Sequence, residues 1–155
     1  MPEPTSVISA AAKAAEAASK VRPWVTVRRN DLLASDEYED LITWARDELR
    51  READALDWVR NDLAARGMLR SGEFGYQLNR VRDEFAQRWR DRKRHADRQL
   101  RDLRTAEGIT ARLWRRFLGS PWPENLWAQE LEQISVLWEN EEQRRAAVQR
   151  EVDSF

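Results

Sequence analysis

The residues of this sequence that are able to support catalysis are few and isolated from one another. The 155 residues include no cysteine and one histidine, His95, which excludes disulfides, zinc–thiolate sites and metal sites built on paired histidines. Asp91 and His95 are four positions apart and can share a helix face, but together they supply at most half of a metal site. Ser71 lacks the first glycine of a nucleophile elbow and is better explained as a helix N-cap. We therefore predict no catalytic residue, no metal, no cofactor and no small-molecule substrate.

The residues best suited to binding a ligand are basic and lie between Arg88 and Arg116. Arginine forms bidentate hydrogen bonds with phosphate, and a basic helix can lie along a nucleic-acid backbone. The candidate phosphate contacts are Arg88, Arg90, Arg92, Lys93, Arg94, Arg112, Arg115 and Arg116. Acids interrupt this run, the net charge of the chain is -1, and an acidic segment of the same chain can pair with it. Nucleic-acid binding is therefore an alternative hypothesis rather than the primary one.

Tryptophan is abundant, with eight copies in the chain. Trp44 and Trp58 are fourteen positions apart, so they share a helix face that one partner helix cannot fully cover. Trp122 lies between two prolines and can serve either as a rigid docking residue or as part of the protein's own core, since aromatic residues are common in both. The predicted protein-interface residues are Trp44, Trp58, Trp122, Trp127 and Trp138.

Long helices must position these residues, because the chain is 35% charged and has only five glycines and five prolines. A heptad stripe is formed by Ile42, Leu49, Leu56 and Leu63, with Ala45, Ala53 and Val59 predicted at the intermediate core positions. This period predicts a helix from Ser35 or Asp36, with Ser35 as its cap, to Arg66. Gly67 is predicted to end it as a C′ residue.

A second long helix is predicted after a short turn, from the N-cap Ser71 to about Thr105, and an extension past Gly108 is left open. Its apolar face comprises Phe74, Leu78, Val81, Phe85, Trp89, Ala96, Leu100 and Leu103. At 1.5 Å per residue each of the two helices is about 45–50 Å long. The short connection between them predicts an antiparallel hairpin.

Shorter segments flank the hairpin. An alanine-rich helix is predicted from Thr5 to Lys20, followed by an extended connector from Val21 to Asn30, because proline within a β-like run disfavours a central strand. An apolar cluster from Ile109 to Leu118 precedes the break G-S-P-W-P-E-N. One amphipathic helix then continues from Pro123 to Phe155. The predicted division is thus 1–30, 31–118 and 119–155.

Charge is arranged in blocks. The local balance is -7 from Asp31 to Asp57, +7 from Arg80 to Arg116, and -5 from Glu124 to Asp153. Folding the hairpin places blocks of opposite sign side by side. We therefore predict charge matching within the chain or between subunits, with a small contribution from each surface pair.

No targeting segment is expected. The mildly apolar run from Val7 to Ala18 is shorter than the ~20 apolar residues that a membrane span needs, and it has no basic region before it of the kind that signal peptides carry. We predict a protein that is neither membrane-bound nor secreted by a signal peptide. The expected location is the cytoplasm or an assembled particle.

The stretch from Asp57 to Leu103, with the turn A-R-G-M-L-R-S-G between charged helices, resembles helical hairpins in minor structural proteins of tailed bacteriophages. The resemblance covers about a third of the chain and does not identify any functional residue in it. The resemblance implies a virion or assembly role.

The overall prediction is an all-α, elongated antiparallel hairpin or coiled-coil-like bundle. Its expected function is that of a non-enzymatic structural or scaffolding subunit that associates with itself or with other protein subunits through helix–helix contacts. The alternative is a nucleic-acid-associated helical adaptor that uses the basic face from Arg88 to Arg116.

Overall fold

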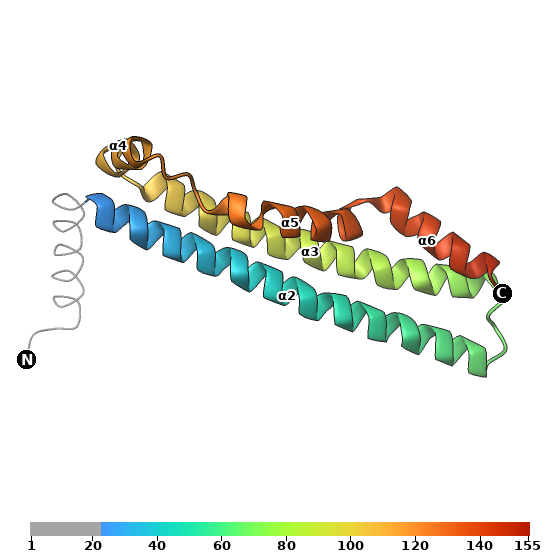
Figure 1. The fold of residues 1–155 in the computed structure, drawn as a ribbon. Helices are drawn as coiled ribbons and strands as arrows, with labels where there is room; N and C mark the ends of the chain where they lie inside the picture. The colour runs from blue at the N-terminus through green and yellow to red at the C-terminus, as the bar shows by residue number, and fades with distance from the viewer. Residues whose placement is uncertain (1–22) are drawn as a thin grey trace, which may run out of the picture.

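The computed structural model describes residues 23–155, which form five helices and no strand. The helices are α2 (Pro23–Ala65), α3 (Gly72–Ala106), α4 (Ile109–Leu118), α5 (Glu124–Glu139) and α6 (Glu141–Asp153). Long antiparallel α2 and α3 lie side by side, α5 and α6 run along them, and α4 lies at the end opposite the α2–α3 turn (Figure 1). The predicted all-α class and the antiparallel hairpin are confirmed. The alanine-rich helix predicted over 5–20 lies outside the described residues.

The start of α2 corrects the predicted connector and cap. The helix begins at Pro23, and Ser35 lies inside it rather than at its N-cap. Val27, Asn30 and Ala34 are buried at helical spacing, so this segment gains interior contacts only as a helix. Proline in the first helical turn removes no intrahelical hydrogen bond, which is why Pro23 does not oppose this start.

The turn between α2 and α3 confirms the predicted role of Gly67 but not the predicted cap by Ser71. Gly67 adopts a left-handed conformation with φ of 68°. Its N–H donates to the Ala64 carbonyl at 3.1 Å, and the Met68 N–H donates to the Leu63 carbonyl at 2.8 Å, which is the Schellman arrangement. Ser71 occupies the N-cap position of α3, but its hydroxyl donates to the Met68 carbonyl at 2.6 Å and does not cap the helix.

Three tryptophans from three helices fill the middle of the core. The ring centroids of Trp44 and Trp89 are 6.5 Å apart, and those of Trp89 and Trp138 are 5.3 Å apart. Trp89 and Trp138 are almost completely buried. A second cluster continues toward the turn, where Val148 of α6 packs with residues of α2 and α3, among them Leu56 and Phe74.

Glu52, rather than Ala53, occupies the interior position of α2 between Ala45 and Val59. Ala53 is exposed and Glu52 is buried, because seven residues after Ala45 is position 52. The Glu52 carboxylate accepts a hydrogen bond from Trp138 Nε1 at 2.7 Å. Burial raises the pKa of Glu52, an effect opposed by the hydrogen bond from Trp138 and by the charges of Arg82 and Arg144.

The C-terminal segment is two helices, not the single helix predicted from Pro123 to Phe155. The chain breaks at Asn140, whose side-chain oxygen caps α6 by accepting from the Gln143 N–H at 3.0 Å. The break turns Arg144 inward, where it donates to the Arg82 carbonyl at 3.1 Å. None of the described helices has both the length and the apolar character required to cross a membrane.

Candidate functional site

A buried network of ion pairs holds α4 against the end of the α2–α3 hairpin. Arg115 of α4 forms ion pairs with Glu107 at 2.8 Å and with Asp31 of α2 at 2.7 Å. Asn30 also donates to Glu107 at 3.5 Å. Burial opposes the charge on Arg115, but hydrogen bonds to Glu107 and Asp31 outweigh it and raise the pKa of Arg115 above its usual value. These contacts fix the orientation of α4 on α2.

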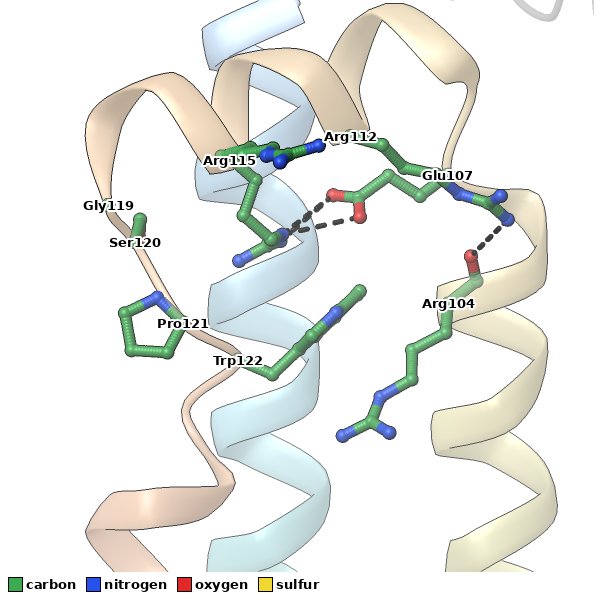
Figure 2. A pocket seen from close by; sticks show the side chains of 9 residues that line it. Arg104, Glu107, Arg112, Arg115, Gly119, Ser120, Pro121 and Trp122 are labelled. Atoms are coloured by element: carbon green, nitrogen blue, oxygen red, sulfur yellow. Dashed lines mark hydrogen bonds and ion pairs between the residues drawn. The ribbon is translucent and has the colours of Figure 1, made fainter.

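The segment after α4 reinforces this attachment. Gly119 ends the helix in a left-handed conformation with φ of 62°. Trp122 then lies beneath the guanidinium of Arg115, 4.0 Å from the ring centroid (Figure 2), in a cation–π contact. Trp122 is half-buried and also packs against the cluster that contains Tyr38 and Leu100. The structure therefore places this predicted interface residue largely within its own chain.

An open cavity of about 600 Å³ lies between α4, the end of α3 and the segment that follows α4. Its lining residues are Arg104, Glu107, Arg112, Arg115, Arg116, Gly119, Ser120, Pro121 and Trp122 (Figure 2). Arg104 pairs with Glu124. Arg112 and Arg116 are exposed and form no ion pair within residues 23–155. The rim of the cavity is therefore basic.

Away from the cavity, α4 exposes five large apolar side chains over about half of its circumference, a surface that we call the α4 face. It consists of Ile109, Leu113, Trp114, Phe117 and Leu118, all exposed. Phe117 is 82% exposed, and its ring meets Trp114 edge-on with centroids 5.9 Å apart. Leu113, Trp114 and Phe117 line a shallow hollow of about 230 Å³. The inner side of α4 is formed by Ala111 and Arg115.

Sequence reasoning identified the cluster from Ile109 to Leu118 but did not recognise it as a surface. The available signal was its size, because a ten-residue helix bounded by glycines carries five large apolar residues. Only one side of such a helix can pack on a bundle. The inner side is held by Arg115 and the small Ala111, so the large side chains point outward.

The other predicted interface tryptophans occupy different environments. Trp44 and Trp138 come together with Trp89 in the core, and Trp127 of α5 is half-buried against the cluster that contains Tyr38 and Leu100. Trp58 is 66% exposed and lies near the turn end of α2. The structure does not gather these residues into one surface.

The candidate phosphate contacts do not form a single surface either. Arg88 pairs with Glu48 at 3.1 Å, Arg92 with Glu37 at 3.3 Å, and Lys93 with Glu139 at 3.4 Å. The predicted matching of acidic and basic blocks is therefore present within one chain. Arg90 donates to Gln87, and Arg94 is exposed. Arg112, Arg115 and Arg116 lie apart from these residues, on α4.

The residues considered for catalysis are likewise dispersed. Asp91 accepts a hydrogen bond from Gln87 at 3.1 Å, and His95 is exposed. Across residues 23–155, no three His, Cys, Asp or Glu side chains come together in a group able to hold a metal ion.

No protein-family model, curated protein or solved structure matches this chain. The fold and the site define a class of protein in physical terms. It is an all-α bundle with a filled, charge-matched middle and an outward-facing amphipathic helix attached to one end.

Proposed function

We propose that the protein is a non-enzymatic structural subunit that joins a larger assembly by docking another protein on the α4 face. The observation that carries this proposal is the exposure of five large apolar side chains on one short helix. Contiguous exposed apolar patches mark interaction surfaces, and aromatic residues dominate their binding energy. Trp114 and Phe117 would be the main anchors.

The attachment of α4 supports this role. A docking surface gains affinity when it is ordered before its partner arrives. The buried pairs of Arg115 with Glu107 and Asp31, and the stacked Trp122, supply that order. A role in a virion or another assembled particle is consistent with the resemblance of the hairpin to phage structural proteins.

Photo-crosslinking in the source cells tests the proposal. Benzoylphenylalanine is incorporated at position 117 and, as a matched control, at position 76, where Tyr76 is 61% exposed on α3. We expect a discrete protein adduct from position 117, identified by mass spectrometry, and none from position 76. Absence of any protein adduct from position 117, or equal adducts from both positions, would contradict the proposal.

Binding of nucleic acid is the second candidate function. Arg94, Arg98 and Arg101 are exposed along α3 and have no acidic partner in the part of the chain described by the structure. Such a stripe can follow a phosphate backbone. Because Arg92 and Lys93 pair with acids of the bundle, they are less suitable probes of binding than these three arginines.

The test of this candidate compares two triple variants of equal charge. Replacing Arg94, Arg98 and Arg101 by glutamine should weaken binding to duplex DNA and reduce its dependence on salt. The control replaces three exposed arginines of α2, Arg28, Arg29 and Arg50. Fluorescence anisotropy measures DNA binding by both variants. An equal loss of affinity in both would mean that binding depends on net charge alone and would reject a specific site on α3.

A further inference from the structure

We propose that the partner of the α4 face is a second copy of this chain, and that it docks through the outer side of α5. This inference rests on the proposed function and names its partner. It requires a complementary surface on the same molecule, and α5 carries one.

The outer side of α5 is an exposed stripe without charged residues, which we call the α5 stripe. Its apolar residues are Leu126 at one end and Val136 and Leu137 at the other, with Gln129 and Gln133 between them on the same helix face. Leu126 is 78% exposed, and Val136 and Leu137 are about half exposed. The inner side is already used, because Ile134 and Trp138 are buried in the core.

The two surfaces have matching lengths. At a rise of 1.5 Å per residue, the α4 face extends about 14 Å from Ile109 to Leu118, and the α5 stripe extends about 16 Å from Leu126 to Leu137. One helix can therefore lie along the other, with apolar contacts at the two ends of the α5 stripe and the glutamines Gln129 and Gln133 between them. Within one chain the two surfaces leave each other uncovered, because the side chains of both are exposed.

The charges beside the two surfaces are opposite. Arg112 and Arg116 flank the α4 face without an acidic partner in residues 23–155. The α5 stripe is flanked by Glu132, which is exposed, and Glu142 follows at the start of α6. Opposite charges beside an apolar contact favour association and fix its register.

The same charges disfavour a symmetric contact between two α4 faces. A two-fold interface places the same surface of each copy against itself, so Arg112 and Arg116 of one copy would approach those of the other. Like charges brought together in this way raise the free energy of the complex. The head-to-tail contact of α4 on α5 avoids this repulsion.

A head-to-tail contact has a distinctive consequence. Each copy that uses its α4 face still offers its α5 stripe, so association continues into a ring or an open chain. One contact between helices of this length is smaller than a standard interface of roughly 1,600 Å². The mass of the assembly should therefore increase with protein concentration.

The test uses the purified full chain and two variants that each lose one surface. The α4 variant carries Leu113→Asp and Phe117→Asp, and the α5 variant carries Val136→Asp and Leu137→Asp. All four side chains are exposed, so helicity and the thermal midpoint should be retained. Tyr76→Asp, at an exposed aromatic residue away from both surfaces, is the matched control.

Light scattering after size exclusion supplies the readout. We expect wild type and Tyr76→Asp to increase in mass with concentration, and each double variant alone to remain monomeric. An equimolar mixture of the two variants should form dimers and nothing larger, because one intact α4 face meets one intact α5 stripe.

Several outcomes would overturn the inference. Wild-type chain that stays monomeric at every concentration would do so, and so would a mixture of the two variants that fails to dimerise. Wild-type behaviour of the α5 variant alone would instead indicate contacts between α4 faces. A crosslink from position 117 to a different protein, combined with monomeric purified chain, would reject self-docking and leave the proposed function intact.

Discussion

The middle of the bundle and its α4 end are built from the same residue types but use them in opposite ways. In the middle, Trp44, Trp89 and Trp138 are enclosed by three helices, and arginines of α3 form ion pairs with glutamates of α2. At the α4 end, Trp114 and Phe117 face outward. The difference lies in what attaches the last helix. α5 is held by its large apolar residues, whereas α4 is held by Arg115 and Ala111.

A buried charge at the α4 end leaves an apolar surface available for binding. The ion pairs of Arg115 with Glu107 and Asp31 occupy the inner side of α4. The large side chains of this helix are then not needed for its attachment. An isolated apolar residue on a surface needs no such explanation, but five on one helix do.

The largest effect is expected in the middle of the bundle. Trp89→Ala should lower the free energy of unfolding by about 3–5 kcal/mol, because a large buried aromatic side chain is lost and a cavity remains. Trp58→Ala is the matched control, since Trp58 is 66% exposed, and it should change stability by less than about 0.5 kcal/mol. Urea unfolding of both variants measures the difference. Equal costs would mean that the two tryptophans are not distinguished by burial.

A local effect of nearly the same size is expected at the α4 end. Glu107→Ala leaves the buried Arg115 with Asp31 as its one remaining ion-pair partner within residues 23–155, and losing one member of a buried pair costs about 3 kcal/mol or more. We expect faster hydrogen exchange in α4, with amides near Trp89 keeping their protection. Asp47→Ala, at an exposed acid of α2 away from both proposed surfaces, should change neither region. Unchanged exchange in α4 would show that the ion network does not hold this helix.

The turn between α2 and α3 is expected to show a smaller effect. Gly67→Ala should destabilise the protein by about 1 kcal/mol, since Gly67 has φ of 68° and no atom within 4 Å of an added methyl, so the cost is that of the left-handed backbone alone. Gly72→Ala also meets open space, but at an ordinary φ, and should be neutral or stabilising. A comparison of the thermal midpoints of the two variants tests this prediction. A Gly67→Ala protein more stable than wild type would contradict the left-handed conformation of Gly67.

The smallest expected effect is a change in pH dependence. The pKa of Glu52 is raised by burial, so its contribution to stability is fully present below its unfolded pKa of about 4.5 and is lost as the pH rises through the folded value. The unfolding free energy of wild type relative to Glu52→Gln should therefore decrease with rising pH above about 4.5 and then level off. Denaturant unfolding from pH 4 to 8 measures this difference. A constant or increasing difference would contradict it.

The parts of the fold that could be predicted depend on strong local signals. The heptad stripe, Gly67 and the alternating charge blocks each favour one arrangement, and the hairpin follows from them. The start of α2 was missed because valine alternation and Pro23 resemble an extended segment, while the buried side of that segment has helical spacing. The break at Asn140 is stabilised by a side-chain cap on α6. Two helices are favoured over one continuous helix only when α5 and α6 each have a surface of the bundle to pack against.

The candidate site could be predicted only in part, because exposure is a property of the assembled bundle. The segment from Ile109 to Leu118 does not by itself indicate which of its sides packs on the bundle. That side is determined by Asp31 and Glu107, which pair with Arg115 only in the folded structure. For Glu52 the prediction was wrong in the other direction. Its neighbour Ala53 was predicted to lie in the core, whereas Glu52 is the buried residue. A carboxylate at that position is tolerated because Trp138 donates to it.

The left-handed turn at Gly67 also determines the order in which the chain can assemble. Contacts beside this turn close short loops, whereas the pair of Asp31 with Arg115 joins residues 84 positions apart, and loop closure becomes more costly with length. A helix of ten residues is marginal in water on its own. We therefore expect α4 to become ordered after the α2–α3 hairpin has formed. A chain that has not finished folding would then lack the completed surface that recruits the next subunit.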